Sequence, residues 1–282
     1  VDGWMNTIDV RDLARQRLHA VLSTTTSIPR RPQALTCSCW AWHLQDTVLR
    51  TPRSELWLKF SAPNLQGVKE QALLAWLVRV LSDQLNETVY LAEQASLDLQ
   101  LKDDYYGFDL RAGGFHEKLP ELLAEGCRAL RRAATAEGWQ GEEMVMRCGD
   151  QRNELLRHWR NEYLKPDDHC ADLRRAVVMP EKYLSTQKAE ALKDLSISQL
   201  QSFAEVFIPT LHLEVLCQGN VLRSDAEKLI ANLPELLGGN SVGKVSGLHA
   251  PHPTIHVLEV PHNKPIVWVQ DSPDSKNRNV AV

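Results

Sequence analysis

The sequence predicts an α+β fold in which helices pack on one face of a mostly antiparallel sheet. Several short segments alternate apolar and polar residues as strands do, and longer segments repeat apolar residues at helical spacing. These strands and helices do not alternate strictly along the chain, which argues against a parallel sheet built from βαβ units. The predicted order is two strands, a long helix, a strand, several helices, a strand, a helix and two final strands.

The first half of the chain opens with a helical pattern at 10–22, followed by a linker rich in Thr, Pro and Arg. Two aromatic-rich strands are expected at 39–44 and 55–60, and the turn-forming residues between them predict an antiparallel pair. A long amphipathic helix then runs over 68–89. The alternation over 106–112 predicts a strand, which the following glycine pair is expected to end.

The second half is mainly helical until its last strands. Helices are expected at 119–130, 142–163, 170–177 and 185–195. Ser198 is predicted to cap the helix that follows them. Alternation over 211–215 predicts a further strand, and two more are expected at 255–260 and 265–270.

Composition and charge exclude several classes of function. The chain has 282 residues, of which 32 are basic and 36 acidic, so its net charge is −4. Such a balance gives no electrostatic footprint for nucleic acid or for an anionic membrane. No apolar run approaches the roughly 20 residues that span a bilayer. The N-terminus has no secretory signal pattern, so we expect a cytoplasmic location. Because the chain opens with Val, we expect a fragment or a processed product.

Two motifs near the C-terminus indicate ligand sites only superficially. Residues 238–244 match most of a phosphate-binding loop, but they follow a helix, and Val245 stands where Ser or Thr would hold magnesium. His249, His252 and His256 have metal-like spacing, yet two prolines among them prevent a helix from aligning them. A flexible glycine loop and solvated histidines are the favoured interpretations.

Other polar and sulfur-containing residues also favour structural roles. The second histidine required by an H-E-x-x-H motif that begins at His116 is replaced by Pro120. His169 and the two aspartates before it are expected to form polar surface rather than a metal site. The six cysteines are too sparse for a disulfide scaffold, and Cys127 and Cys148 are expected to be buried free thiols. Four tryptophans occur in patterns typical of a core, namely Trp40, Trp42, Trp57 and Trp76.

Four stretches together resemble the third domain of the insulin-degrading enzyme, nardilysin and pitrilysin family of zinc peptidases. They cover residues 39–63, 81–101, 105–123 and 208–221. The segment L-N-E-x-x-Y-x-A-E at 85–93 is specific to this family. The resemblance implies one of four similar α+β domains arranged as a clamshell, of which the first carries the zinc motif H-x-x-E-H.

The resemblance also implies a domain organisation. Residues 1–35 would be a helix and linker that end the preceding domain. Residues 36–240 would form the non-catalytic α+β domain. Residues 241–282 would be the connector and the first strands of the domain that follows.

The zinc-binding residues of the family are missing from this sequence. The helix over 68–81, which corresponds to the zinc-binding helix, contains no histidine and is lined by Leu73, Trp76, Leu77 and Val80. H-x-x-E-H occurs nowhere in the chain. We therefore assign no catalytic, cofactor-binding or metal-binding residue to this chain and expect it to be inactive alone. Zinc would belong to the catalytic domain of the parent enzyme.

The resulting hypothesis is a non-catalytic, chamber-forming domain or fragment of an insulin-degrading-enzyme-like or nardilysin-like zinc metalloendopeptidase. Its partners would be other domains or subunits of the same peptidase, with peptide substrate in the full enzyme and neither nucleic acid nor membrane. The alternative is a free-standing pseudoenzyme subunit that pairs with a separate catalytic chain. A third hypothesis, an independent hydrolase, would require Ser/His/Asp chemistry or the histidine cluster at 249–256.

Overall fold

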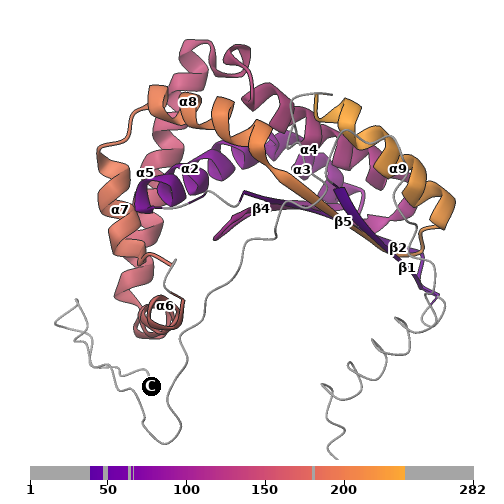
Figure 1. The fold of residues 1–282 in the computed structure, drawn as a ribbon, viewed down its shortest axis with the longest axis horizontal. Coiled ribbons are helices and arrows are strands. Elements are labelled where there is room, and N and C mark those ends of the chain that lie inside the picture. Colours follow the sequence, from indigo (N-terminus) through magenta and orange to yellow (C-terminus); the bar gives the residue numbers. More distant parts are fainter. Residues whose placement is uncertain (1–38, 47–49, 63–64, 66, 180–181, 239–282) are drawn as a thin grey trace, which may run out of the picture. The chain divides into compact units, whose positions relative to one another are not determined.

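The computed structural model describes residues 39–46, 50–62, 65, 67–179 and 182–238 (Figure 1). The helix predicted at 10–22 and the strands predicted at 255–260 and 265–270 lie outside these residues. Those elements and the division into the segments 1–35, 36–240 and 241–282 therefore stay predictions. Among the described helices, none combines the length and apolar character that crossing a membrane requires.

Within the described ranges, five strands form one mixed sheet. They are β1 (Cys39–Gln45), β2 (Arg53–Ser61), β3 (Asp98–Asp104), β4 (Gly107–Phe115) and β5 (His212–Gly219). Their order is β1-β5-β2-β4-β3. The β1–β5 pair is parallel and the other three pairs are antiparallel. The predicted α+β class with a mostly antiparallel sheet is confirmed.

The predicted pairing of the first two strands is wrong. β5 lies between β1 and β2, so that Val215 is opposite Ala41 on one side and opposite Leu58 on the other. The turn residues between β1 and β2 reverse the chain direction without making the strands neighbours. In the interior of the sheet, β5 pairs both of its edges and buries Leu213 and Cys217 under the helices.

The structure also differs from the predictions over β3, β4 and the long helix. β4 continues through the glycine pair because Gly114 has φ +133°, and a Cβ there would lie 2.7 Å from Cδ2 of Leu97. The sequence patterns above did not predict β3, although its Leu99 and Leu101 alternate with polar residues. The predicted long helix is interrupted at Leu85, which lies between two separate helices.

Helices pack on one face of the sheet, and further helices extend beyond it. They are α2 (Val68–Gln84), α3 (Asn86–Gln94), α4 (Leu119–Ala133), α5 (Glu142–Leu164), α6 (Pro166–Val178), α7 (Ser185–Lys193), α8 (Ile197–Phe207) and α9 (Arg223–Leu236). Helix α6 begins four residues before its predicted start because Pro166 suits a first helical turn. Ser196, not Ser198, caps α8, since its Oγ accepts a hydrogen bond from the Gln199 N–H at 3.3 Å.

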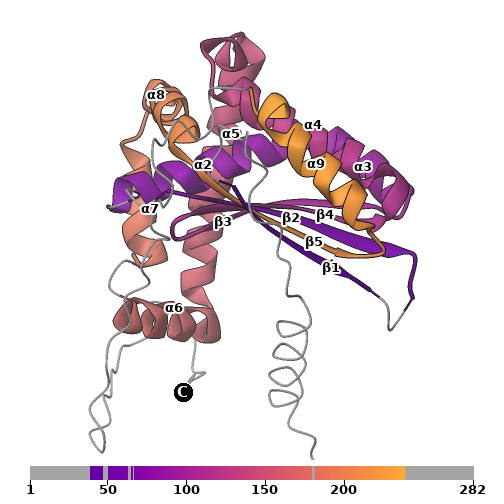
Figure 2. The same cartoon turned by 45° about the vertical axis from the view of Figure 1, so that its right-hand side comes forward.

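Figures 1 and 2 show α4, α8 and α9 above the same face of the sheet as α2, whereas α6 lies on the opposite side. Helices α5, α6 and α7, with residues 182–184 before α7, form a unit that we call the helical arm. The arm extends past the β3–β4 side of the sheet. One face of the sheet therefore lacks a helical cover among the described residues.

The core lies between the sheet and α2. Leu56, Leu58 and Phe60 of β2 are at most 1% exposed and face the helices. Trp76 is fully buried, and its indole N–H donates a 2.9 Å hydrogen bond to the carbonyl of Cys148. The predictions that Cys148 and Cys127 are buried free thiols are confirmed.

Candidate functional site on the open face of the sheet

A row of mainly aromatic, apolar and cationic side chains crosses the open face of the sheet. Because side chains alternate along a strand, the residues between the buried leucines of β2 point away from the helices. The strand register places one residue of each strand in this row, namely Trp42, Leu216, Trp57, Arg111 and Gln100. Trp42 is 40% exposed and Trp57 is 37% exposed. We call these five residues the open-face row.

The expectation that the tryptophans belong to the core holds for Trp76 and is wrong for Trp42 and Trp57. Trp57 stands between Leu56 and Leu58, which both point into the core, so strand alternation turns its indole to the open face. The alternation itself carries this signal in the sequence. The aromatic type of the residue obscures it, because tryptophan is usually a core residue.

Arg111 is held over Trp57 by an ion pair. Its guanidinium carbon lies 5.7 Å from the centre of the Trp57 ring, and its Nε donates a 2.7 Å hydrogen bond to Oε2 of Glu55. This hydrogen bond raises the pKa of Arg111, so the cation is maintained. Planar guanidinium and indole groups in this arrangement offer a flat surface that can contact both apolar and polar parts of a peptide.

A second row on the same face carries charges of alternating sign. Its members are Glu214, Lys59, Asp109 and Lys102, on four adjacent strands. We call them the charged row. Burial raises the pKa of Asp109, although the nearby Lys59 partly opposes this effect. The face as a whole therefore offers both signs of charge beside aromatic surface, which suits mixed peptide sequences better than a polyanion.

A buried ion pair within the helical arm lies against the turn of the β3–β4 hairpin. Nζ of Lys182 lies 2.6 Å from Oδ1 of Asp172, and it lies 5.9 Å from the centre of the Tyr105 ring in the hairpin turn. Oδ2 of Asp172 accepts a 2.9 Å hydrogen bond from the backbone N–H of Ser185. Burial alone would raise the pKa of Asp172, but the hydrogen bonds from Lys182 and Ser185 outweigh it and lower that pKa.

The residues weighed as possible ligands lie in different parts of the structure. His169 is 7% exposed on α6, so the expectation that it forms polar surface is wrong, whereas Asp168 makes an exposed ion pair with Lys165. No cluster of three or more potential metal ligands occurs within the described ranges. The histidines at 249–256 lie outside the described residues. The assignment of no catalytic, cofactor-binding or metal-binding residue stays a prediction.

Helix α2 presents packing residues where the resemblance implies zinc ligands in the catalytic domain. Trp76, Leu77 and Val80 are at most 1% exposed and Leu73 is 8% exposed. These apolar side chains can pack but cannot coordinate a metal ion.

Comparisons with known proteins find relatives of this chain in sequence and in structure. Residues 16–191 match the family model described as the middle or third domain of peptidase M16. A nardilysin-like protein of Arabidopsis thaliana is 30% identical over 191 residues, which are 66% of this chain and 17% of that protein. Human insulin-degrading enzyme is 27% identical over 186 residues, covering 66% of this chain and 18% of the enzyme. The chain thus spans less than a fifth of these relatives' lengths.

Solved structures share the fold. The crystal structure of pitrilysin matches 72% of this chain and 21% of its own, with a TM-score of 0.60 and 14% identity. A crystal structure titled as a peptidase M16 inactive domain from Pseudomonas fluorescens matches 75% of this chain and 51% of its own, with a TM-score of 0.52 and 15% identity.

Proposed function

This chain belongs to the peptidase M16 family, and on that premise we propose that it is a non-catalytic, chamber-forming part of a larger zinc metalloendopeptidase. The parent would resemble insulin-degrading enzyme or nardilysin, and it would act on peptides in the cytoplasm. The observation that carries the proposal is the open-face row, which extends across all five strands without a helical cover among the described residues.

The exposure of the two tryptophans supports a binding role for this face. Trp42 and Trp57 are large apolar groups, and moving their surface out of water lowers the free energy of the system. Exposed apolar patches of this kind mark contact sites. The helical arm beyond the β3–β4 side supports a role in enclosure because it flanks the open face (Figure 2). Peptide held against this face would be bounded by the sheet and by the arm.

The packing of α2 supports the proposal that catalysis takes place on another domain of the parent enzyme. Its buried tryptophan and leucines stabilise the domain, and none of these side chains can coordinate a metal ion. The reaction would then take place on another domain, which would hold the zinc ion. This chain would bind and enclose the peptide and would supply none of the groups that react.

The first test is metal analysis combined with a quenched-peptide assay on the purified chain. We expect no stoichiometric zinc and no hydrolysis above background. Stoichiometric zinc together with hydrolysis that a chelator abolishes and zinc restores would contradict the proposal and favour an independent hydrolase.

The second test examines the open face in the peptidase that contains this segment. Removing Trp57 and Arg111 together, as Trp57→Ala with Arg111→Ala, should raise KM about threefold to thirtyfold and leave kcat nearly unchanged, because the loss affects binding of substrate and transition state alike. Tyr90→Ala is the matched control, since Tyr90 is 61% exposed on helix α3, away from the open face. Equal KM values for the double variant and the control would contradict the role as a wall.

The oligomeric form of the native protein decides between the main proposal and its alternative. If the native polypeptide ends where this chain ends and copurifies with a separate catalytic peptidase chain, the pseudoenzyme subunit replaces the proposed fragment. Mass spectrometry of the intact native protein provides this measurement.

A further inference from the structure

Strand β3 forms one edge of the described sheet. It pairs with β4 alone among the described strands. In an antiparallel pair, every second residue of an edge strand directs its backbone N–H and C=O away from the partner. These groups can accept the backbone of another extended segment, which is a recurring mode of peptide recognition.

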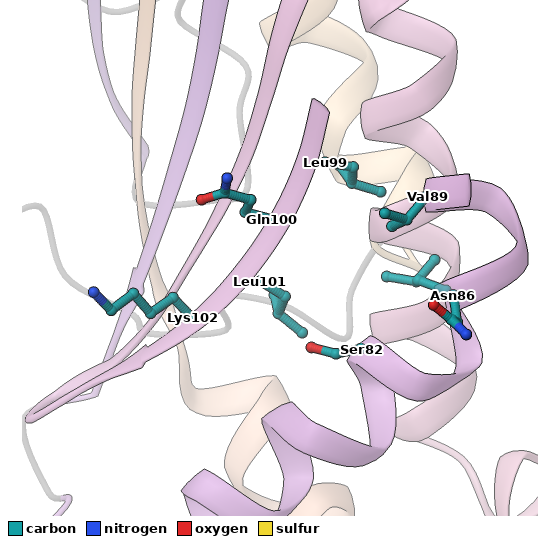
Figure 3. Close-up of a pocket in the computed structure, with 8 residues that line it drawn as sticks. Ser82, Asn86, Val89, Leu99, Gln100, Leu101 and Lys102 are labelled. Carbon is teal, nitrogen blue, oxygen red and sulfur yellow. The ribbon is translucent and has the colours of Figure 1, made fainter. Parts of the chain in front are cut away.

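A groove of about 370 Å³ lies beside this edge, between β3 and the junction of α2 with α3. Figure 3 shows Leu99 extending from β3 towards Val89 of α3 and Leu101 extending towards Ser82 of α2, while Gln100 and Lys102 extend from the opposite face of the strand. The volume is within the range of about 300–1,000 Å³ that is typical of ligand pockets. An added strand would thus have space for apolar side chains on its helix-facing side.

The charged row indicates which side chain would suit the other side of an added strand. The row runs Glu214, Lys59, Asp109 and Lys102, so the sign of the charge changes from each strand to the next. Lys102 ends the row on the edge strand and is exposed. Opposite charges in neighbouring positions of a sheet attract. The next position beyond Lys102 is therefore suited to a carboxylate.

We propose that the outer edge of β3 binds an extended segment of a peptide substrate as an additional strand. The segment would place apolar side chains in the groove at alternate positions and an acidic side chain beside Lys102. The proposal rests on the proposed function, which it deepens by naming a subsite and a sequence preference. A helical ligand would leave the outward backbone groups of β3 unpaired, which disfavours it.

The test uses the full 282-residue chain and labelled synthetic peptides whose binding is measured by fluorescence anisotropy. The first peptide has about ten residues, enough for one strand, with alternating valine and threonine and a central glutamate. The second has lysine in place of the glutamate. The third keeps the glutamate but carries backbone N-methyl groups that prevent strand pairing.

The expected result is a charge preference that Lys102 controls. The glutamate peptide should bind about threefold to tenfold more tightly than the lysine peptide, as expected for an exposed charge pair. Lys102→Glu should reverse this order because it reverses the charge at the end of the row. The N-methylated peptide should not bind measurably, because it cannot form the ladder of hydrogen bonds.

A second pair of variants tests the groove without altering the core. Asn86→Trp should weaken binding of the glutamate peptide by about tenfold or more, because the indole fills the space beside Leu99 and Leu101. Tyr90→Trp is the control on the same helix, since Tyr90 does not line the groove. Both altered positions are exposed, and unchanged thermal unfolding would verify that the variants fold.

Several outcomes would overturn the subsite. They are failure of the glutamate peptide to bind, equal binding of the N-methylated peptide, no effect of Asn86→Trp, and occupation of the edge by a second copy of the chain in sedimentation experiments. These results leave the KM test of Trp57 and Arg111 untouched. Conversely, peptide binding with the predicted preferences, combined with an unchanged KM in that double variant, would reject only the wall role of the open face.

Discussion

Lys182 and Asp172 form an ion pair that is almost completely removed from solvent, with 2.6 Å between Nζ and Oδ1 and side-chain exposures of 5% and 9%. Lys182 belongs to the loop before α7 and Asp172 to α6, so the pair connects two parts of the helical arm. The same ammonium contacts the Tyr105 ring in the β3–β4 hairpin turn. The pair therefore lies where the arm contacts the hairpin turn.

Asp172→Asn should destabilise the protein by about 3–5 kcal/mol, because the buried ammonium of Lys182 loses its counter-charge. Chemical denaturation of the chain and the variant measures the difference. Asp168→Asn on the same helix is the control. Its partner Lys165 is 74% exposed, so that change should cost less than about 1 kcal/mol. Equal losses of unfolding free energy in the two variants would show that the buried pair stabilises the protein no more than the exposed pair does.

The contribution of Asp172 should also depend on pH. Its pKa is lowered in the folded state, so its stabilising effect is fully present above the unfolded-state value of about 4 and is lost as pH falls through the folded value. The gap in unfolding free energy between the chain and Asp172→Asn should therefore narrow below about pH 4. A gap that stays constant from neutral pH into this acid range would contradict the assignment.

Asp109→Asn should stabilise the protein at neutral pH. Burial raises the pKa of this carboxyl, and its Oδ1 has no hydrogen-bond partner within the described part of the chain. A raised folded pKa means that the ionised form costs stability above it, and that this cost disappears below the unfolded value of about 4. The gain should not exceed about 1 kcal/mol because solvent screens a partly exposed group. A fall in Tm at neutral pH would contradict this account.

The buried thiols should resist alkylation in the native protein. Burial raises the pKa of Cys127 to about 12 and that of Cys148 to about 11, so little reactive thiolate forms near neutral pH. Partly exposed Cys170 serves as the internal reference. Peptide mapping after iodoacetamide treatment should show Cys170 modified first, with all three thiols modified in denaturant. Modification of Cys127 as fast as Cys170 would contradict its burial.

Much of the fold follows from local sequence patterns. The strands β1, β2, β4 and β5 and most helices were predictable because each repeats apolar residues with its own period. The neighbours of β5 were not predictable, since pairing depends on which buried faces fit together across distant parts of the chain. The break at Leu85 was also missed because apolar spacing continues through it from α2 into α3.

The open face was harder to predict than the core. The alternation around Trp57 gives the direction of its side chain, but no local pattern indicates that the other strands place Leu216 and Arg111 beside it. The Lys182–Asp172 pair joins residues in different elements, and only the packing of the arm brings them together. A row or a pair of this kind is a product of tertiary register, which single-sequence reasoning does not reach.

The position of β5 between β1 and β2 has a practical consequence for anyone who shortens this protein. The family match ends at residue 191, whereas β5 begins at His212. A truncation at the end of the match would remove an interior strand, separate β1 from the sheet and leave one side of β2 available for aggregation. During synthesis, the sheet likewise cannot form completely until β5 has been made. Assembly of the sheet therefore depends on contacts between residues that are distant in the sequence.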